Sequence, residues 1–137
     1  MTDNYRAALD VLVQTGAGQN ARRNRAAEVA PDFVRLALGF SYGDILARPG
    51  LDLKLRALAL VAAHAALPAS DELHAHVAAA LHLGWSKAEL IELLVQSAIH
   101  AGIPAALRSL ADCHDLLVDR NSCHSGCEAS VSCDGQL

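Results

Sequence analysis

The chain has 137 residues, a formal net charge of −4, and a composition in which 53% of the residues are hydrophobic but only 4% are aromatic. This length suits one domain with an ordinary core, and a mildly acidic chain without a basic face argues against a nucleic-acid partner. We expect a cytoplasmic protein, because no apolar signal-peptide segment follows Met1. We also expect no membrane partner, because no run approaches about 18 apolar residues.

The hydrophobic pattern is helical throughout, with glycine and proline between the apolar segments. Alanine is abundant and β-branched residues are sparse, which favours closely packed helices over a sheet. The expected helices cover residues 4–15, 32–40, 53–67, 71–83, 87–101 and 104–118, with a shorter helical stretch around 22–25. We therefore predict an all-α bundle of about six helices.

Local signals mark several of these helix ends. Pro31 suits the first turn of the third helix, because its missing N–H has no intrahelical partner there. Gly84 closes the helix over 71–83. Ser86 followed by Glu89 has the spacing of a capping box, which predicts that the next helix begins at Lys87.

Three arginines lie close together at positions 22, 23 and 25. Such a cluster is able to bind an anion. From the sequence alone we favour the simpler interpretation, a solvated helix face.

The helix expected over 71–83 carries three of the chain's seven histidines. At about 100° per residue, Glu72 and His76 fall on one side of its apolar stripe, whereas His74 lies on the opposite flank and His82 points away from the core. A carboxylate one turn from a half-buried imidazole orients the ring and raises its pKa, which suits a general acid or base. The alternative is structural: acidic residues complement the helix dipole, and the histidine bonds a backbone group.

Arg56, His64 and His100 each carry a polar group on a mainly apolar helix. Arg56 heads the most apolar helix, where its guanidinium either forks a substrate carboxylate or extends past the core into solvent. His100 lies near a helix end, where it either complements the dipole or reaches into a pocket. We interpret His64 as a core histidine, because it lies within an alanine- and leucine-rich run.

All four cysteines lie in the last 25 residues. Cys113 falls in the last expected helix, and the others lie in a Ser- and Gly-rich segment with little to bury. That segment contains four possible zinc ligands, Cys123, His124, Cys127 and Cys133. We nevertheless expect no metal, because the C-x3-C spacing is loose and no second pair is present. The predicted organisation is one helical domain over residues 1–118 and a disordered tail over 119–137.

Four segments resemble, in order, motifs of the carboxymuconolactone decarboxylase family, the non-peroxidase branch of the AhpD-like superfamily. They read GQNARR (18–23), YGDILARPGL (42–51), ELHAHVAAA (72–80) and QSAIHAGIPAA (96–106). Arg56 matches the family's arginine at the head of the core helix. The peroxidase branch is excluded, because Ala69 and Glu72 occupy the positions of its cysteine pair.

The resemblance implies an AhpD-like fold that assembles into a homotrimer or homohexamer. It also implies a 4-carboxymuconolactone decarboxylase-like enzyme that needs neither cofactor nor metal and acts on a small carboxylated lactone or a related cyclic acid. In this interpretation Arg56 anchors a carboxylate, His76 moves the proton and Glu72 orients His76 or shares the proton. The implied substrate-binding residues are Tyr42, Arg48 and His100.

The chain departs from the family pattern at residues 40–46, where FSYGDIL replaces a segment with one histidine and two tryptophans, and at His100, where the family has tyrosine. We expect these changes to reshape the substrate pocket more than the reaction class. Two other functions remain open. One is a non-catalytic oligomeric module that binds a small acid or a partner helix, and the other is an isomerase or lyase of the same fold acting on a polyketide-type intermediate.

Overall fold

The computed structural model describes residues 2–18, 20–68 and 71–119. Within these ranges the secondary structure is helical and contains no strand, which confirms the predicted all-α fold. The N-terminal helices are α1 (Thr2–Gln14), α2 (Ala21–Val29), α3 (Pro31–Leu38) and η1 (Gly39–Leu46). The C-terminal helices are α4 (Leu53–Ala66), α5 (Asp71–His82), α6 (Lys87–Gln96), α7 (Ala98–Ala101), α8 (Ile103–Asp112) and α9 (His114–Leu117).

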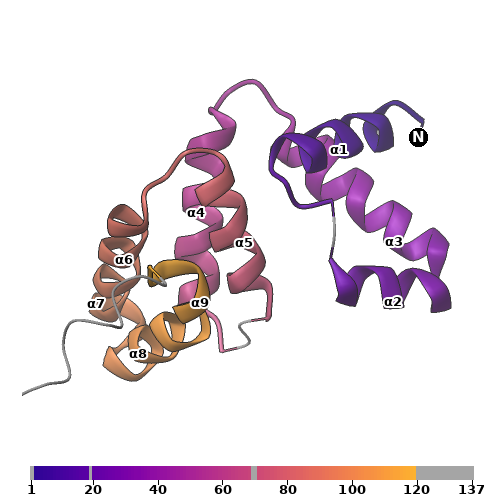
Figure 1. Ribbon diagram of the computed structural model, residues 1–137. Coiled ribbons are helices and arrows are strands. Elements are labelled where there is room, and N and C mark those ends of the chain that lie inside the picture. The colour runs from indigo at the N-terminus through magenta and orange to yellow at the C-terminus, as the bar shows by residue number, and fades with distance from the viewer. Residues whose placement is uncertain (1, 19, 69–70, 120–137) are drawn as a thin grey trace, which may run out of the picture.

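Helices α4 and α5 lie side by side in the middle of the molecule (Figure 1). Helices α6 to α9 lie on one side of this pair, and α1, α2 and α3 lie on the other. The α4–α5 pair therefore separates α1, α2 and α3 from α6 to α9. In the part of the chain that the structure describes, no helix is long and apolar enough to cross a membrane.

The hydrophobic core lies between the C-terminal helices α4, α5, α6 and α9. Its fully buried members include Val61 of α4, Leu73 and Val77 of α5, and Leu90 and Leu94 of α6. Alanine side chains from α4 and α5, together with Cys113 and Leu117, belong to the same cluster. Short side chains let two helices approach closely, which agrees with the composition of the chain.

The N-terminal helices form a second packing unit, in which α1 lies against η1. The segment η1 is a π-helical continuation of α3, whereas we predicted an α-helix that ends at residue 40. Gly43 of η1 lies directly against α1, and a Cβ atom there would overlap the carbonyl oxygen of Asn4. Asn4 also donates a hydrogen bond from Nδ2 to Asp44, at 3.2 Å. Contact with α1 therefore determines where η1 lies.

Two predicted helices are each divided in the structure. The helix expected over 87–101 is interrupted at Ser97, whose hydroxyl donates to the carbonyl oxygen of Leu94 at 2.6 Å. Such side-chain bonds compete with the regular backbone ladder. The helix expected over 104–118 is interrupted at Cys113, where φ of −106° and ψ of 13° leave the helical region.

The predicted caps are present. Pro31 is the first residue of α3. At the start of α6, the backbone N–H of Ser86 donates to the carboxylate of Glu89 at 2.8 Å, and the backbone N–H of Glu89 donates to the Ser86 hydroxyl at 3.2 Å. The capping box therefore fixes where α6 begins.

Candidate active site

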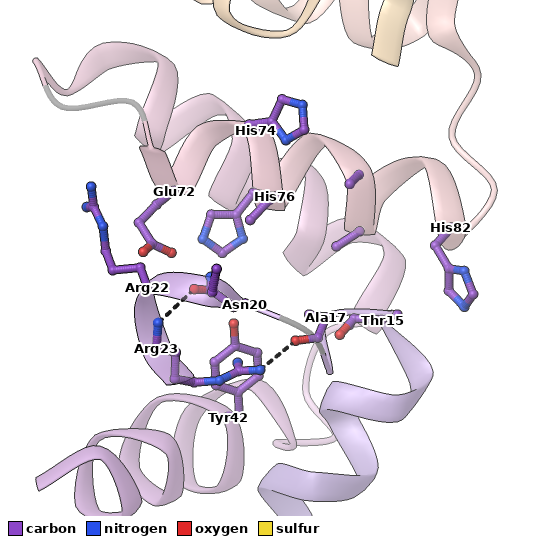
Figure 2. Close-up of a pocket in the computed structure, with 15 residues that line it drawn as sticks. Thr15, Ala17, Asn20, Arg22, Arg23, Tyr42, Glu72, His74, His76 and His82 are labelled. Carbon is purple, nitrogen blue, oxygen red and sulfur yellow. Dashed lines mark hydrogen bonds between the residues drawn. The ribbon is translucent and has the colours of Figure 1, made fainter. Parts of the chain in front are cut away.

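A cavity of about 560 Å³ lies between α5 and the N-terminal helices (Figure 2). One wall is the face of α5 that carries Glu72, His76 and Ala79. The opposite wall comes from the turn after α1, the start of α2, and η1. Its residues include Thr15, Ala17, Asn20, Arg22, Arg23 and Tyr42.

Helix α5 presents Glu72 and His76 to this cavity because its apolar stripe faces the core. Leu73 and Val77, the next residues along the helix, are fully buried. Residues four apart lie on one face of a helix, so Glu72 and His76 share the neighbouring face. They lie on the same side of α5, as predicted.

Hydrogen bonds shape the opposite wall. Oδ1 of Asn20 caps α2 by accepting from the backbone N–H of Arg23 at 2.9 Å. The guanidinium of Arg23 turns back and donates through Nη2 to the carbonyl oxygens of Ala17 (2.9 Å) and Gly18 (2.6 Å). Arg23 therefore ties the turn after α1 to the start of α2.

Tyr42 is the residue of η1 that reaches the cavity. In Figure 2 its hydroxyl points toward α5, and the side chains of Glu72 and His76 extend from α5 into the same space. Burial raises the pKa of Tyr42; Arg23 opposes this shift, and Glu72 adds to it. The phenol therefore stays protonated at neutral pH and is a hydrogen-bond donor to a ligand.

His76 is an uncharged imidazole at neutral pH. Burial lowers the pKa of His76 to about 4, and repulsion from His64 adds to the effect. The two rings stack with centroids 4.5 Å apart and planes at 28°. The raised pKa that we expected from Glu72 is therefore wrong, because removal from water disfavours the charged form of the imidazole. No hydrogen bond joins Glu72 to His76 in the described part of the chain.

A smaller apolar recess lies beside the cavity, and Tyr42 and His76 line both. The other lining residues of the recess include Leu46, Leu53 and Leu60. Aliphatic side chains exclude water from one side of the phenol and the imidazole, which is the physical source of both pKa shifts.

The structure does not bring Arg56, Arg48 and His100 to this cavity. Nε of Arg56 donates to the carbonyl oxygen of Leu51 and Nη2 donates to that of Arg48, each at 3.0 Å, so the guanidinium holds the turn before α4. The side chain of Arg48 lines a separate cavity against α1. His100 is exposed on α7, which lies on the other side of α4 from the N-terminal helices.

His74 and His82 lie at the rim of the cavity and have structural contacts. Nε2 of His74 lies 3.0 Å from Oδ2 of Asp115, which joins α5 to α9. This hydrogen bond lowers the pKa of Asp115. The ring of His82 covers Gly16, where φ is 66° and a Cβ atom would lie 3.1 Å from the ring. Glycine at this position lets the turn approach α5.

The possible metal ligands that the sequence contains lie mainly in the cysteine tail, where we expected no metal. Its candidate ligands, Cys123, His124, Cys127 and Cys133, lie outside the described residues. Cys113 is buried in the core, and burial raises the pKa of its thiol to about 11, with Asp112 and Asp115 adding to the shift. Among residues 2–18, 20–68 and 71–119, no group of three or more His, Cys, Asp or Glu side chains is arranged to hold a metal ion.

The wall made by residues 15–17 and 20–23 is the part of the site that sequence reasoning missed. We favoured a solvated face for the arginine cluster, yet Arg22 and Arg23 line the cavity while Arg25 is exposed outside it. The signal was present, because GQNARR is one of the four segments that carry the family resemblance. His64, interpreted as a core histidine, is the stacking partner of His76.

Comparison with known proteins identifies the family of the chain. Residues 31–111 match the model of the carboxymuconolactone decarboxylase family. Over 110 residues the chain is 33% identical to a protein of Acinetobacter baylyi named 4-carboxymuconolactone decarboxylase, and the match covers 77% of this chain and 82% of that relative. The family match includes Tyr42, Glu72 and His76.

Proposed function

Since the chain belongs to the carboxymuconolactone decarboxylase family, we propose that it removes CO2 from a small carboxylated lactone or a related cyclic acid without a cofactor. One observation carries this proposal. A single cavity has an uncharged imidazole and a protonated phenol on facing walls, and Arg22 and Arg23 line the same cavity. These groups suffice to anchor an anion, stabilise an oxyanion and deliver a proton.

In this proposal the arginine side of the cavity anchors the substrate. Arg22 and Arg23 both line it, whereas Arg56 does not. A guanidinium suits a carboxylate because it donates two parallel hydrogen bonds. We therefore assign the anchoring role to Arg22 and Arg23, and to Arg56 the support of the turn that its two hydrogen bonds hold.

The bond that breaks joins a ring carbon to the carboxylate carbon. Its electron pair moves through the conjugated C=C bond to the lactone carbonyl, whose oxygen becomes negative. The Tyr42 phenol donates a hydrogen bond to that oxygen. The apolar recess beside it keeps water away, which strengthens the interaction.

His76 delivers the proton to the ring carbon after CO2 leaves. The imidazole is neutral in the empty cavity, and the negative charge of a bound substrate favours the imidazolium. Glu72 supports the same protonation from one turn away. Binding of the substrate carboxylate thus favours the imidazolium form of His76, which donates the proton in the next step.

The test uses purified protein with 4-carboxymuconolactone and a panel of related cyclic acids, without added metal. We expect CO2 release and a product lighter by one CO2. His76→Gln should lose about 100-fold or more in kcat, the contribution typical of a general acid. His114→Gln is the matched control, because His114 is exposed on α9 and does not line the cavity.

Other outcomes discriminate between the functions that the sequence leaves open. Wild-type turnover in His76→Gln would remove His76 from the mechanism. Ligand binding without product across the panel would favour a non-catalytic module. A product of unchanged mass would favour an isomerase.

We also propose that the protein acts as a homotrimer or homohexamer. Phe33, Leu36 and Phe40 form one exposed apolar row on α3 and η1, and Ile99, Ile103 and Leu107 form another on α7 and α8. Their side chains are between 59% and 74% exposed in the single chain. Apolar rows of this kind mark association surfaces. Light scattering after gel filtration measures the assembly, and a monomer at micromolar concentration would contradict the proposal.

A further inference from the structure

His64 and His76 form a pair of stacked imidazoles that joins α4 to α5. The ring centroids are 4.5 Å apart, close to van der Waals contact. Nδ1 of His64 is buried and has no hydrogen-bond partner among the described residues. Leaving a buried polar atom unpaired costs about 1–3 kcal/mol. A histidine at this position therefore needs a reason beyond filling space.

The pair lies at the edge of the cavity. His76 lines the cavity and His64 does not, so His64 stands behind the ring that a ligand would meet. The charged or titratable groups that line the cavity with His76 are Glu72 on its own helix, Tyr42 on η1, Arg22 and Arg23 on α2, and His74 and His82 at the rim. Among the groups that surround the His76 ring, His64 on α4 is the one whose repulsion lowers the pKa of His76.

We propose that His64 is the positioning residue for His76: it holds the imidazole in one orientation beside the cavity and opposes a positive charge on it while the cavity is empty. A flat ring at stacking distance restricts rotation of its neighbour. Repulsion between two imidazoles acts in the same direction as burial, and both lower the pKa of His76. The role in turnover rests on the proposed function, whereas the effect on protonation does not.

This pairing has a consequence for the order of events. His76 takes up a proton from solvent when a carboxylate enters the cavity, because the anion offsets the repulsion. After the carboxylate leaves as CO2, the imidazolium donates that proton to the ring carbon. One substrate anion and one proton thus become CO2 and a neutral C–H product, and both imidazoles end uncharged.

The first test follows the titration of His76 by NMR, without any substrate. His64→Phe keeps a flat ring but removes both nitrogens, and His64→Leu removes the ring as well. The signal of His76 is assigned by its absence in His76→Gln. We expect the pKa of His76 to rise by on the order of one pH unit in both variants. His114→Phe, a substitution at an exposed position on α9, should leave it unchanged.

Whichever variant folds, as judged by circular dichroism, decides the question. An unchanged His76 titration in a folded His64 variant overturns the proposal. If both fold, the kcat values separate orientation from charge. His64→Leu should lose on the order of tenfold because the ring is no longer held, whereas His64→Phe should retain kcat and move the basic limb of the kcat/KM profile, where His76 loses its proton, to higher pH.

Equal losses of kcat in the two variants would overturn the orienting role. A wild-type protein that releases no CO2 from any substrate would instead overturn the proposed function. The NMR titration would still decide whether His64 controls the protonation of His76, so the two failures are distinguishable.

Discussion

Replacing His76 by glutamine should change how the stability of the protein responds to acid. In the folded chain the pKa of His76 is about 4, against 6.5 for an ordinary histidine. Between these values the unfolded chain binds a proton that the folded chain does not. The free energy of unfolding therefore falls as the pH drops through this window, and His76 contributes its full stabilisation only above pH 6.5.

The magnitude follows from the same two values. Each pH unit corresponds to about 1.36 kcal/mol, so the upper limit is about 3.4 kcal/mol. The ring is only partly buried, and solvent screening reduces this to about 1–2 kcal/mol. Wild-type protein should thus lose about 1–2 kcal/mol more than His76→Gln when the pH falls from about 7 to about 4.5.

Urea unfolding at the two pH values, followed by circular dichroism, measures this difference. Groups such as Asp115 and Glu89 titrate in both proteins, so their contributions cancel in the comparison. His114→Gln is the matched control and should behave as wild type, because His114 is exposed on α9. Equal acid sensitivity of wild type and His76→Gln would refute the claim that burial keeps this imidazole neutral.

Three further predictions concern the walls and supports of the cavity. Gly43→Ala should destabilise the protein by about 1–3 kcal/mol in urea unfolding, because the new Cβ overlaps the backbone of α1; an unchanged midpoint would show that α1 moves freely away from η1. Arg23→Gln should lower kcat/KM by on the order of tenfold or more, because in the proposed function its guanidinium both holds the turn after α1 and binds the substrate anion. Arg25→Gln is the control and should leave kcat/KM unchanged. Equal effects of the two substitutions would contradict the anchoring role. Asp115→Asn should weaken the hydrogen bond from His74 that links α5 to α9. Because His74 lowers the pKa of the Asp115 carboxyl, the difference in the free energy of unfolding between variant and wild type should shrink as the pH falls below about 3.8. A difference that persists in acid would argue that the hydrogen bond does not depend on charge.

The parts of the fold that depend on local sequence were predictable. The start of α6 follows from Ser86 and Glu89, and the orientation of α5 follows from the spacing of its apolar residues. The interruptions at Ser97 and Cys113 were not, because each follows from a local side-chain or backbone conformation inside a long apolar segment. The π-helical form of η1 also escaped prediction, since it depends on contact with α1, which is distant in the sequence.

The candidate site was predictable only in part, for a similar reason. Glu72 and His76 share a helix, so their spacing was enough to place them together. The position of the Arg56 guanidinium depends on the carbonyl groups of Arg48 and Leu51 in the turn before α4, to which it donates hydrogen bonds. The low pKa of His76 depends on burial and on a ring from another helix, and no pattern within α5 carries that information.

The two walls of the cavity differ in how strongly substitutions in them affect the hydrophobic core. The wall that carries His76 belongs to the helix whose other face builds the core, so most changes near it disturb the fold. The described residues of the facing wall, 15–17, 20–23 and Tyr42, are not members of the core cluster of buried residues between Ala57 and Leu117. Substitutions there can therefore accumulate during divergence without disturbing that core cluster. Under the proposed function, we expect relatives that share His76 to differ in the acids they accept through their N-terminal segments, and exchanging that segment between relatives tests this.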